Sequence, residues 1–238
     1  MRIERIESTI MSENAYVVTP RDSEESLIVD PGFGTADPIK RYLQENGLQA
    51  KAVLLTHGHP DHVWDAAAFD LPVYIPKPDM YRLDNPMDFL PAAFGTMGSW
   101  KKPADIRPIP SQLIELVPGL PILMVPAPGH TEGSAIFLTS IPGGDTFDTN
   151  AELPSTRTGL KELQTTQPLA LVGDVIFAGS VGRTDLPGGD ETQMRQSLRT
   201  LANAIDPKTW MLPGHGPATH WAHEQESNPY VRRAKEVG

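Results

Sequence analysis

The segment THGHPDHVWD, at residues 56–65, concentrates side chains that bind metal ions. His57, His59, Asp61 and His62 fall within six positions, although the whole chain has only seven histidines. In an extended segment residues i and i+2 point to the same side, so His57 and His59 can direct two imidazoles at one point. Neutral imidazole is the commonest metal-ligating side chain. The spacing therefore favours a metal site over a solvated turn.

Asp61 and His62 follow where the chain is expected to enter a helix, and an aspartate suits a helix N-terminus. Their side chains could meet at a second point near the first. His130 in APGHTEGS and His215 in LPGHGP each follow an apolar strand, and Asp174 interrupts the apolar run LVGDVIF. A carboxylate in such a run is costly to bury unless it is paired or bound to a cation.

The elements that must position these side chains are short. Apolar or alternating runs predict strands at 3–8, 14–19, 25–32, 52–56, 72–76, 113–117, 122–128, 134–140, 169–179 and 209–216, several of them ending in turns. Helical spacing and capping signals predict helices at 35–47, 63–69 and 192–205, and a helical tail at 222–238 that breaks at Pro229. Runs of strands followed by helices favour an α+β arrangement, with strands sandwiched under helices, over an alternating parallel sheet.

Two segments lack clean periodicity. Residues 77–110 are interpreted as a loop-rich excursion that either covers a cleft or packs against the core, and residues 142–166 as a polar insertion. No linker divides the chain convincingly, so we expect one domain over residues 1–238.

Composition excludes several classes of function. The chain has 20 Lys and Arg against 30 Asp and Glu, a formal net charge of −10, which disfavours binding to nucleic acid. The absence of cysteine rules out disulfides, thiolate ligands and cysteine nucleophiles. Neither a signal peptide nor an apolar run of about 20 residues is evident, so we expect a cytoplasmic protein without a membrane partner. The oligomeric state stays open.

With these motifs the chain resembles the metallo-β-lactamase superfamily. THGHPDH has the HxHxDH pattern, and PGHTEGS, the Gly173-Asp174 pair and PGHG follow in the family's order. Within the superfamily the chain is most similar to the glyoxalase II-like (hydroxyacylglutathione hydrolase-like) enzymes of the short bacterial type, on VGRTDLPGGD at 181–190 and NPYVR at 228–232. The resemblance implies a four-layer αβ/βα sandwich with the site at one edge.

The resemblance also implies two divalent metal ions. Seven ligands are implied, three for each ion and one that bridges them: His57, His59 and His130 for the first ion, Asp61, His62 and His215 for the second, and Asp174 between them. Ligation by N and O alone suits Zn²⁺, with Fe or Mn as alternatives. Asp61 and Asp174 are the carboxylates to which we assign catalytic roles.

Such a site implies hydrolysis. Two cations can share a water and lower its pKa to about 7, so that a bridging hydroxide attacks a carbonyl whose developing charge is stabilised. The activity implied by the resemblance is that of a thioesterase acting on a small-molecule thioester of the S-lactoylglutathione kind. Two-domain glyoxalase II enzymes carry a C-terminal helical domain that grips glutathione. We expect that domain to be missing after Gly216, which leaves the thiol carrier open.

Weaker predictions concern the surroundings of the site. Asp30 and Thr56 could form hydrogen bonds that hold the loop of metal ligands in place. Asp30 could equally be a turn-forming residue without a role at the metal site. Arg183 could meet a substrate carboxylate or pair with Asp185 to shape its loop, and we favour the pairing. Three C-terminal side chains could contact a charged substrate tail or form a solvated helix face, which we favour: Tyr230, Arg232 and Arg233.

Rival functions remain. A mononuclear iron persulfide dioxygenase shares these motifs and would use His57, His130 and Asp174 as a 2-His-1-carboxylate face. Lactone or β-lactam hydrolysis is a further alternative, which the 181–190 loop and the tail disfavour. A nuclease is disfavoured by the acidity of the chain. A metal-binding protein without activity is disfavoured because all seven ligands are present.

Overall fold

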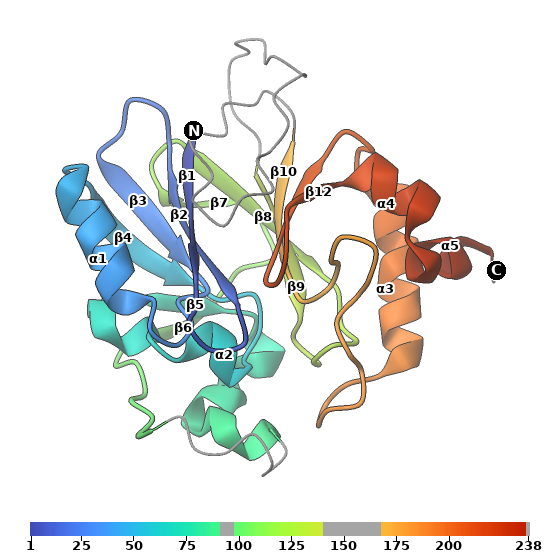
Figure 1. Cartoon of the computed structure of the whole chain (residues 1–238), viewed down its shortest axis with the longest axis horizontal. Coiled ribbons are helices and arrows are strands. Elements are labelled where there is room, and N and C mark those ends of the chain that lie inside the picture. Colours follow the sequence, from blue (N-terminus) through green and yellow to red (C-terminus); the bar gives the residue numbers. More distant parts are fainter. Residues whose placement is uncertain (91–97, 140–167, 237–238) are drawn as a thin grey trace.

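The computed structural model describes residues 1–90, 98–139 and 168–236, and it shows two six-stranded sheets packed face to face (Figure 1). In order across the first sheet lie β1 (Arg2–Glu7), β2 (Asn14–Thr19), β3 (Glu25–Val29), β4 (Gln49–Leu54), β5 (Val73–Ile75) and β6 (Ile106–Pro108). The second sheet follows the order β12 (Thr219–His220), β11 (Trp210–Pro213), β10 (Leu169–Gly173), β9 (Ala135–Thr139), β8 (Leu120–Pro126) and β7 (Ile114–Val117).

Helices cover both outer faces of this pair of sheets (Figure 1). α1 (Ala36–Glu45) lies on the first sheet, while α3 (Glu191–Ala204), α4 (Trp221–Ser227) and α5 (Pro229–Glu236) lie on the second. The four-layer sandwich predicted from the sequence is therefore confirmed, as is the break of the helical tail at Pro229. The prediction of one domain stays a prediction.

Alternation along the strands explains the three apolar layers. On β2, Tyr16 and Val18 face the second sheet and join the central core, whereas Ala15 and Val17 join the layer under α1. Successive side chains of a strand point to opposite faces, so a strand buried on both sides is apolar throughout. The same division on β10 sends Leu171 to the central core and its neighbours toward α3.

Strand direction determines where the loops gather. β3, β4, β5 and β6 are parallel, and so are β10 and β11. β8 is antiparallel to β9, which is antiparallel to β10, so β8 also runs with β10 and β11. Loops that follow parallel strands emerge at the same edge of a sheet, and every predicted ligand follows one of these strands.

Some predicted elements were wrong. The helix predicted over 63–69 is replaced by the short α2 (Pro60–Val63) and a 3₁₀ turn, η1 (Ala66–Phe69). The excursion at 77–110 contains more regular structure than expected: the 3₁₀ helices η2 (Lys77–Asp84) and η3 (Pro86–Phe89), and β6. β6 has only three residues and is defined by its pairing with β5, so the local sequence pattern does not predict it. The predicted insertion at 142–166 lies outside the described residues.

Within the described residues, no helix combines the length and the apolar character that a bilayer-spanning helix requires.

Candidate metal centre

The first four candidate ligands lie where β4 turns into α2. The chain leaves β4 at Leu54 and stays buried through His57, and His59 is the N-cap residue of α2. Pro60 takes the first helical position, where the N–H that proline lacks is not needed. Asp61 and His62 follow inside the helix. An abrupt change from strand to helix thus presents four polar side chains over six residues.

The remaining three come from the second sheet. His130 follows β8, Asp174 follows β10 directly, and His215 follows β11. The ends of β10 and β11 approach the centre closely, because a Cβ atom on Gly214 would lie 2.4 Å from Asp174 Oδ1. Glycine there lets the main chain pass where another residue would displace the carboxylate.

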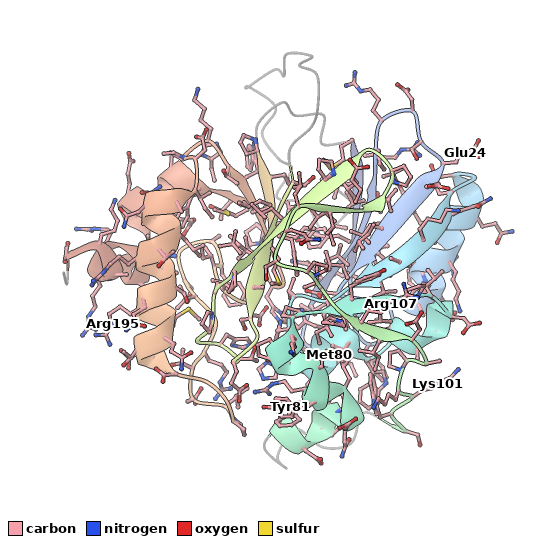
Figure 2. All side chains as sticks on the ribbon, turned by 180° about the vertical axis from the view of Figure 1, so that it is seen from behind. Glu24, Met80, Tyr81, Lys101, Arg107 and Arg195 are labelled. Atoms are coloured by element: carbon pink, nitrogen blue, oxygen red, sulfur yellow. The ribbon has the colours of Figure 1, made fainter. Side chains whose placement is uncertain are left out.

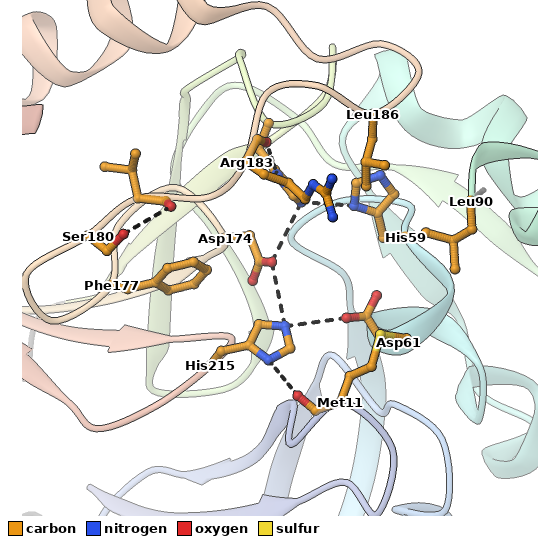
Figure 3. A pocket seen from close by; sticks show the side chains of 12 residues that line it. Met11, His59, Asp61, Leu90, Asp174, Phe177, Ser180, Arg183, Leu186 and His215 are labelled. Carbon is orange, nitrogen blue, oxygen red and sulfur yellow. Dashed lines mark hydrogen bonds and ion pairs between the residues drawn. The ribbon is translucent and has the colours of Figure 1, made fainter. Parts of the chain in front are cut away.

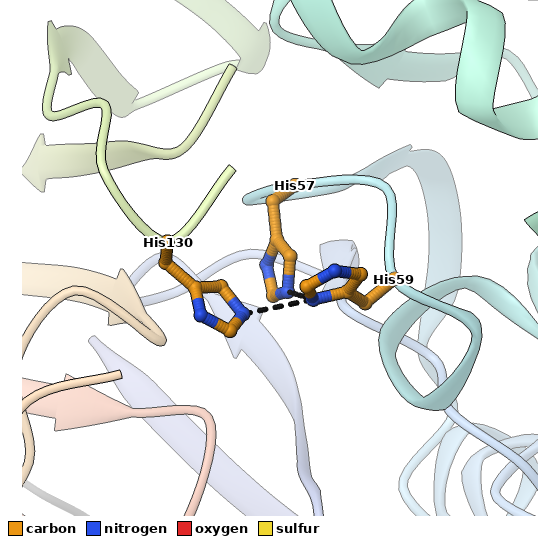
Figure 4. Close-up of side chains that lie close together, drawn as sticks. All are labelled: His57, His59 and His130. Atoms are coloured by element: carbon orange, nitrogen blue, oxygen red, sulfur yellow. Dashed lines mark hydrogen bonds between the residues drawn. The ribbon is translucent and has the colours of Figure 1, made fainter. Parts of the chain in front are cut away.

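Three imidazoles form the first group of side chains (Figure 4). His59 Nδ1 lies 3.1 Å from His57 Nε2 and 2.8 Å from His130 Nε2. All three residues are buried, with exposed fractions of 3% or less. One atom from each of them falls within 4.8 Å of the others, the spacing expected of donors that surround one ion.

The second group contains Asp61, His62 and His215, again with one atom each within 4.8 Å. Figure 3 shows Asp61 beside His215. His215 Nε2 lies 3.3 Å from Asp61 Oδ2, and His62 Nε2 lies 3.9 Å from the same oxygen. These are the only two imidazoles of the five that contact Asp61 among the described residues. The group combines one carboxylate with two rings.

Asp174 stands between the two groups (Figure 3). Its Oδ1 lies 3.2 Å from His62 Nε2 in the second group. Its Oδ2 lies 3.6 Å from His130 Nε2 in the first group and 3.5 Å from His215 Nε2 in the second. A single carboxylate that reaches both groups has the placement of a bridging ligand.

Hydrogen bonds at the outer ring nitrogens decide which nitrogen faces the centre. His130 Nδ1 donates to the carbonyl oxygen of Arg183 at 2.7 Å, and His215 Nδ1 donates to that of Met11 at 3.0 Å. A carbonyl only accepts, so these Nδ1 atoms carry the hydrogen and each Nε2 keeps its lone pair. His62 Nδ1 likewise lies 3.0 Å from Asp30 Oδ2, a carboxylate that accepts.

His57 is oriented through Thr56. The Thr56 hydroxyl donates to Asp30 Oδ2 at 2.6 Å, which leaves it to accept from His57 Nδ1 at 3.0 Å. His57 Nε2 and His130 Nε2 therefore both present lone pairs to His59 Nδ1. A single N–H on His59 could satisfy only one of them.

These observations test whether the residues fit a metal ion. His62 Nε2 and Asp174 Oδ1 lie 3.2 Å apart, and both are buried without a hydrogen-bond partner in the described parts of the chain. Buried lone pairs that face one another are unfavourable unless a cation lies between them. The donors are imidazole nitrogens and carboxylate oxygens, a set that zinc, iron and manganese accept. The cluster suits a centre of two metal ions.

The electrostatics of the two groups differ. Burial lowers the pKa of His57 well below its usual value, and the neighbouring histidines lower it further. Burial also lowers the pKa of His59 to about 3. Neutral imidazoles are the form that binds metals, so the first group needs no deprotonation at neutral pH.

In the second group the neighbouring carboxylates raise the pKa values of the histidines instead of lowering them. Burial opposes the charge on His62, but Asp174 and Asp61 outweigh burial and raise its pKa well above the usual value. The pKa of His215 is also raised, because hydrogen bonding to Asp61 and the charge of Asp174 overcome burial. Burial would raise the pKa of Asp174, but His62, His130 and His215 hold it low. A cation here would displace protons.

The predicted supporting residues take defined places. Asp30 accepts from the Thr56 backbone N–H at 2.7 Å as well as from the Thr56 hydroxyl, and it touches His62, so it backs both groups. The Arg183 side chain pairs with Asp185 through contacts of 2.6 and 2.7 Å, the arrangement that we favoured. The carbonyl of Arg183, which the sequence did not single out, orients His130.

Sequence reasoning missed Asp79, which lies on η2 and is fully buried. Asp79 Oδ2 accepts from the Gly58 N–H and from the Thr131 hydroxyl, both at 2.8 Å, and Oδ1 accepts from the Gly133 N–H at 2.7 Å. One carboxylate thereby ties the loop of His57 and His59 to the loop of His130. The surrounding segment has no periodicity, so no sequence signal identified it.

Asp79 is accompanied by Arg82, whose side chain is also fully buried. Arg82 Nε lies 3.4 Å from Asp79 Oδ1, and Arg82 Nη2 contacts Glu132 and the carbonyl of Pro187. Its guanidinium stacks on Phe89 at 4.4 Å from the ring centroid. The ion pairs and this stacking join η2 and η3 to the loop after β8, so the excursion at 77–110 supports the centre as well as packing against the core.

Glu13 is the other residue that sequence reasoning missed. It is fully buried beside the second group, with Oε1 at 3.9 Å from His62 Nδ1, and neither carboxyl oxygen has a hydrogen-bond partner within the described residues. Burial raises its pKa well above the usual value. Its backbone bridges His215, so β2 is anchored to the loop after β11.

A cavity of about 340 Å³ opens over the centre (Figure 3). The side chains of His59, Asp61 and Asp174 form part of its lining. Its walls are mainly apolar and come from three segments of the chain: Met11, Leu90, and Phe177, Val181 and Leu186 after β10. Small-molecule sites commonly combine apolar walls with a few polar groups at one point. The cavity gives a small substrate access to the cluster.

Comparison with known proteins agrees with this geometry. The family model of the Metallo-beta-lactamase superfamily matches residues 9–215. An uncharacterized protein of Mycobacterium tuberculosis is 30% identical over 234 residues, which cover 93% of this chain and 94% of the relative. Hydroxyacylglutathione hydrolase GloC of Haemophilus influenzae is 27% identical over 249 residues, which cover 97% of this chain and 98% of the relative.

Among solved structures, TTHA1623 in a di-iron-bound form is similar to this chain with a TM-score of 0.69 and 30% identity. The match covers 95% of this chain and 98% of that one. The range matched by the family model, residues 9–215, contains the positions of all seven candidate ligands.

Proposed function

The chain belongs to the metallo-beta-lactamase superfamily. From that premise we propose that it is a cytoplasmic thioesterase of the glyoxalase II type. The proposed cofactors are two divalent metal ions, with zinc preferred over iron or manganese. The proposed substrate is a small-molecule thioester, and neither nucleic acid nor membrane is a proposed partner. Support comes from the motifs at 181–190 and 228–232 and from the similarity to the Haemophilus influenzae hydrolase.

One observation carries the proposal: Asp174 reaches both ligand groups at the floor of an apolar-walled cavity. When bound, a pair of divalent cations would supply an activated water at neutral pH and polarise a carbonyl oxygen. Hydrolysis of a thioester requires both, and it requires no serine or cysteine nucleophile.

The chain's own residues have separate tasks in this proposal. Seven side chains hold the ions, and Asp30, Thr56 and the carbonyls of Met11 and Arg183 keep the imidazoles in the required orientation. The apolar walls bind the acyl part of the substrate and limit the entry of bulk water. The Arg183 side chain lines the same cavity and supplies a positive charge near its wall.

The test combines elemental analysis with a substrate panel. The purified full-length protein is expected to contain two equivalents of metal and to hydrolyse S-lactoylglutathione or a related thioester faster than a lactone or a β-lactam. Preference for the lactone or the β-lactam would contradict the thioesterase assignment. A protein that binds metal but hydrolyses nothing in the panel would contradict the proposal that it is a hydrolase.

The rival function is that of a persulfide dioxygenase. His57 and Asp174 fall in one candidate metal group, and His130 lies 3.6 Å from Asp174, so a mononuclear iron site could form. Against it, Asp61, His62 and His215 assemble as a further group that such a site would leave unused. A single equivalent of iron together with oxygen consumption on glutathione persulfide would establish the rival function.

A further inference from the structure

Two leucines form part of the wall of the cavity over the metal centre. Leu90 follows η3 directly, and Leu186 lies in the loop after β10. Both line the cavity together with His59, and Figure 3 shows their side chains around His59. Leu186 is buried and Leu90 is half-buried. Because the two leucines come from segments distant in sequence, contacts outside the cavity must fix how far apart they lie.

Arg82 contacts the residue next to each leucine. Its guanidinium carbon lies 4.4 Å from the centroid of the Phe89 ring, and its Nη2 donates to the carbonyl oxygen of Pro187 at 2.8 Å. Phe89 precedes Leu90 in the sequence, and Pro187 follows Leu186. A guanidinium is planar and holds its donors in a fixed geometry. The buried Arg82 side chain therefore connects the segments of both leucines from behind the wall.

Glu132 holds the outer end of this connection. It accepts a hydrogen bond from Arg82 Nη2 and another from the Tyr81 hydroxyl at 3.0 Å. The side chain of Glu132 is 42% exposed, and Tyr81 also lies at the surface, on η2 (Figure 2). Glu132 thus fixes the buried guanidinium from the solvent side, where its own side chain can be truncated without opening the core.

The loop after β10 packs directly on the pair of Arg82 and Glu132. A Cβ atom on Gly188 would overlap both Arg82 Nη2 and Glu132 Oε2. Gly188 also has a φ of +87°, which residues with a side chain rarely adopt. The loop that carries Leu186 therefore has no room to move toward the pair while both side chains are in place.

We propose that Arg82 and Glu132 are positioning residues that set the separation of Leu90 and Leu186, and that the two leucines select the substrate by the length of its acyl chain. This inference rests on the proposed thioesterase function. A short aliphatic chain would pack against the leucines while the thioester carbon lies over the metal centre. Burial of each methylene group there favours the longer of two short chains.

The experiment compares two thioesters of the same neutral thiol, N-acetylcysteamine, that carry an acetyl or a butyryl group. The wild type should prefer the butyryl ester by about tenfold in kcat/KM, the scale of burying two methylene groups. Glu132→Ala should reduce this preference to about threefold or less, mainly by raising KM for the butyryl ester. Glu132→Gln keeps an oxygen that accepts from Arg82, so it should retain most of the preference.

A double-mutant cycle tests whether Glu132 acts through the leucines. Leu186→Ala removes part of the wall directly and should itself lower the preference for the butyryl ester. Glu132→Ala should then change the preference no further in the Leu186→Ala protein, because residues that act through one contact are not additive. Additive effects of the two substitutions would show that Glu132 acts elsewhere and would overturn the proposal.

Asp84→Ala is the matched control for Glu132→Ala. Asp84 lies on η2, as Arg82 does, but it is exposed and pairs with the exposed Lys102. The preference of this variant for the butyryl ester should equal that of the wild type. Equal losses in the two variants, or a wild type that does not prefer the butyryl ester, would overturn the proposed selection by chain length while thioester hydrolysis itself stood.

If no thioester is hydrolysed, the proposed function fails, and direct binding then decides about the wall. Acetate and butyrate both offer a carboxylate to the metal ions and differ only in the chain, and each can be titrated into the metal-loaded protein by calorimetry. Butyrate that binds about tenfold more tightly than acetate to the wild type, but not to Glu132→Ala, would support the proposed wall. Equal binding of the two anions by the wild type, or the same ratio in both proteins, would contradict it.

Discussion

The two ligand groups of the candidate metal centre differ in the charge that their surroundings favour on the histidines. His57, His59 and His130 form an all-imidazole group, in which burial keeps His57 and His59 neutral. Asp61, His62 and His215 form a group in which carboxylates draw protons onto the histidines. A cation can enter the first group without displacing a proton, but it competes with protons in the second. The difference predicts that acid affects binding of the second ion more strongly.

The groups also differ in what holds them. The first is clamped by Asp79, which reaches from η2 to the two loops that carry its histidines. The second is held by hydrogen bonds from His62 to Asp30 and from His215 to the carbonyl oxygen of Met11. Asp174 contacts His130 of the first group and both His62 and His215 of the second. Each substitution below therefore has a distinct expected pattern.

Asp174→Asn should have the largest effect, because it removes the charge shared by both groups. We expect kcat/KM to fall by at least about a thousandfold, as for the loss of a principal electrostatic group, and the metal content to fall below two equivalents. Steady-state kinetics and elemental analysis would measure these changes. Asp185→Asn, which alters an exposed carboxylate beside Arg183, is the control. Full metal occupancy in Asp174→Asn would show that the two groups do not share this ligand.

Asp79→Asn should act mainly on the first group. The amide can replace only part of the acceptor capacity that Gly58, Thr131 and Gly133 require, and Arg82 is left buried beside a neutral partner. We expect the free energy of unfolding to fall by about 3 kcal/mol, as when a buried charge loses its partner. Binding of the first ion should weaken by about 10–100-fold, as for other residues that orient ligands.

Urea denaturation of the metal-free protein and metal titration would measure the two effects of Asp79→Asn separately. Asp84→Asn is a matched control, because Asp84 lies on the same 3₁₀ helix but is exposed and pairs with the exposed Lys102. If Asp79→Asn weakened binding of both ions equally, the clamp would not be specific to the first group.

The pH dependence of the metal-free protein should separate the groups. The unfolded chain takes up a proton at His59 near pH 6.5, but the folded chain resists it down to about pH 3, so His59 costs stability as the pH falls. Between pH 6.5 and pH 5 the wild type should lose up to about 2 kcal/mol relative to His59→Gln. Denaturation of both proteins at each pH would show this difference.

His215 should behave in the opposite way. Its pKa is raised on folding, so the stability it contributes is complete below pH 6.5 and is lost as the pH rises through the higher folded value. His215→Gln should therefore approach the wild type in stability at alkaline pH rather than in acid. Parallel pH profiles for His59→Gln and His215→Gln would contradict the electrostatic contrast between the groups.

Arg183→Ala should have the smallest effect on the centre. His130 is held by the backbone carbonyl of Arg183, which the substitution keeps, while the exposed side chain pairs with Asp185. Metal content should stay at the wild-type value, and the melting temperature should change by no more than about 2 °C. Loss of metal from this variant would show that the side chain, through its loop, is needed to orient His130.

The sequence by itself predicted candidate ligands and strands packed under helices, and its resemblance to a known superfamily implied the full ligand set and the four-layer sandwich. Spacing alone brought His57 and His59 to one side of an extended segment, and apolar strands before His130, Asp174 and His215 placed these residues at strand ends. These signals are local, because the period of a strand and the identity of a side chain can be read within a few residues. Only the approach of the two sheets made one cluster of them.

Tertiary structure alone decided how the cluster is supported. Asp79 lies in a segment without a pattern, Glu13 is buried by strands distant in sequence, and His130 depends on a carbonyl that any residue at 183 would offer. β6 likewise exists through its pairing with β5. A hydrogen bond between distant loops depends on where the folded chain brings them, and neither residue type nor spacing encodes that distance.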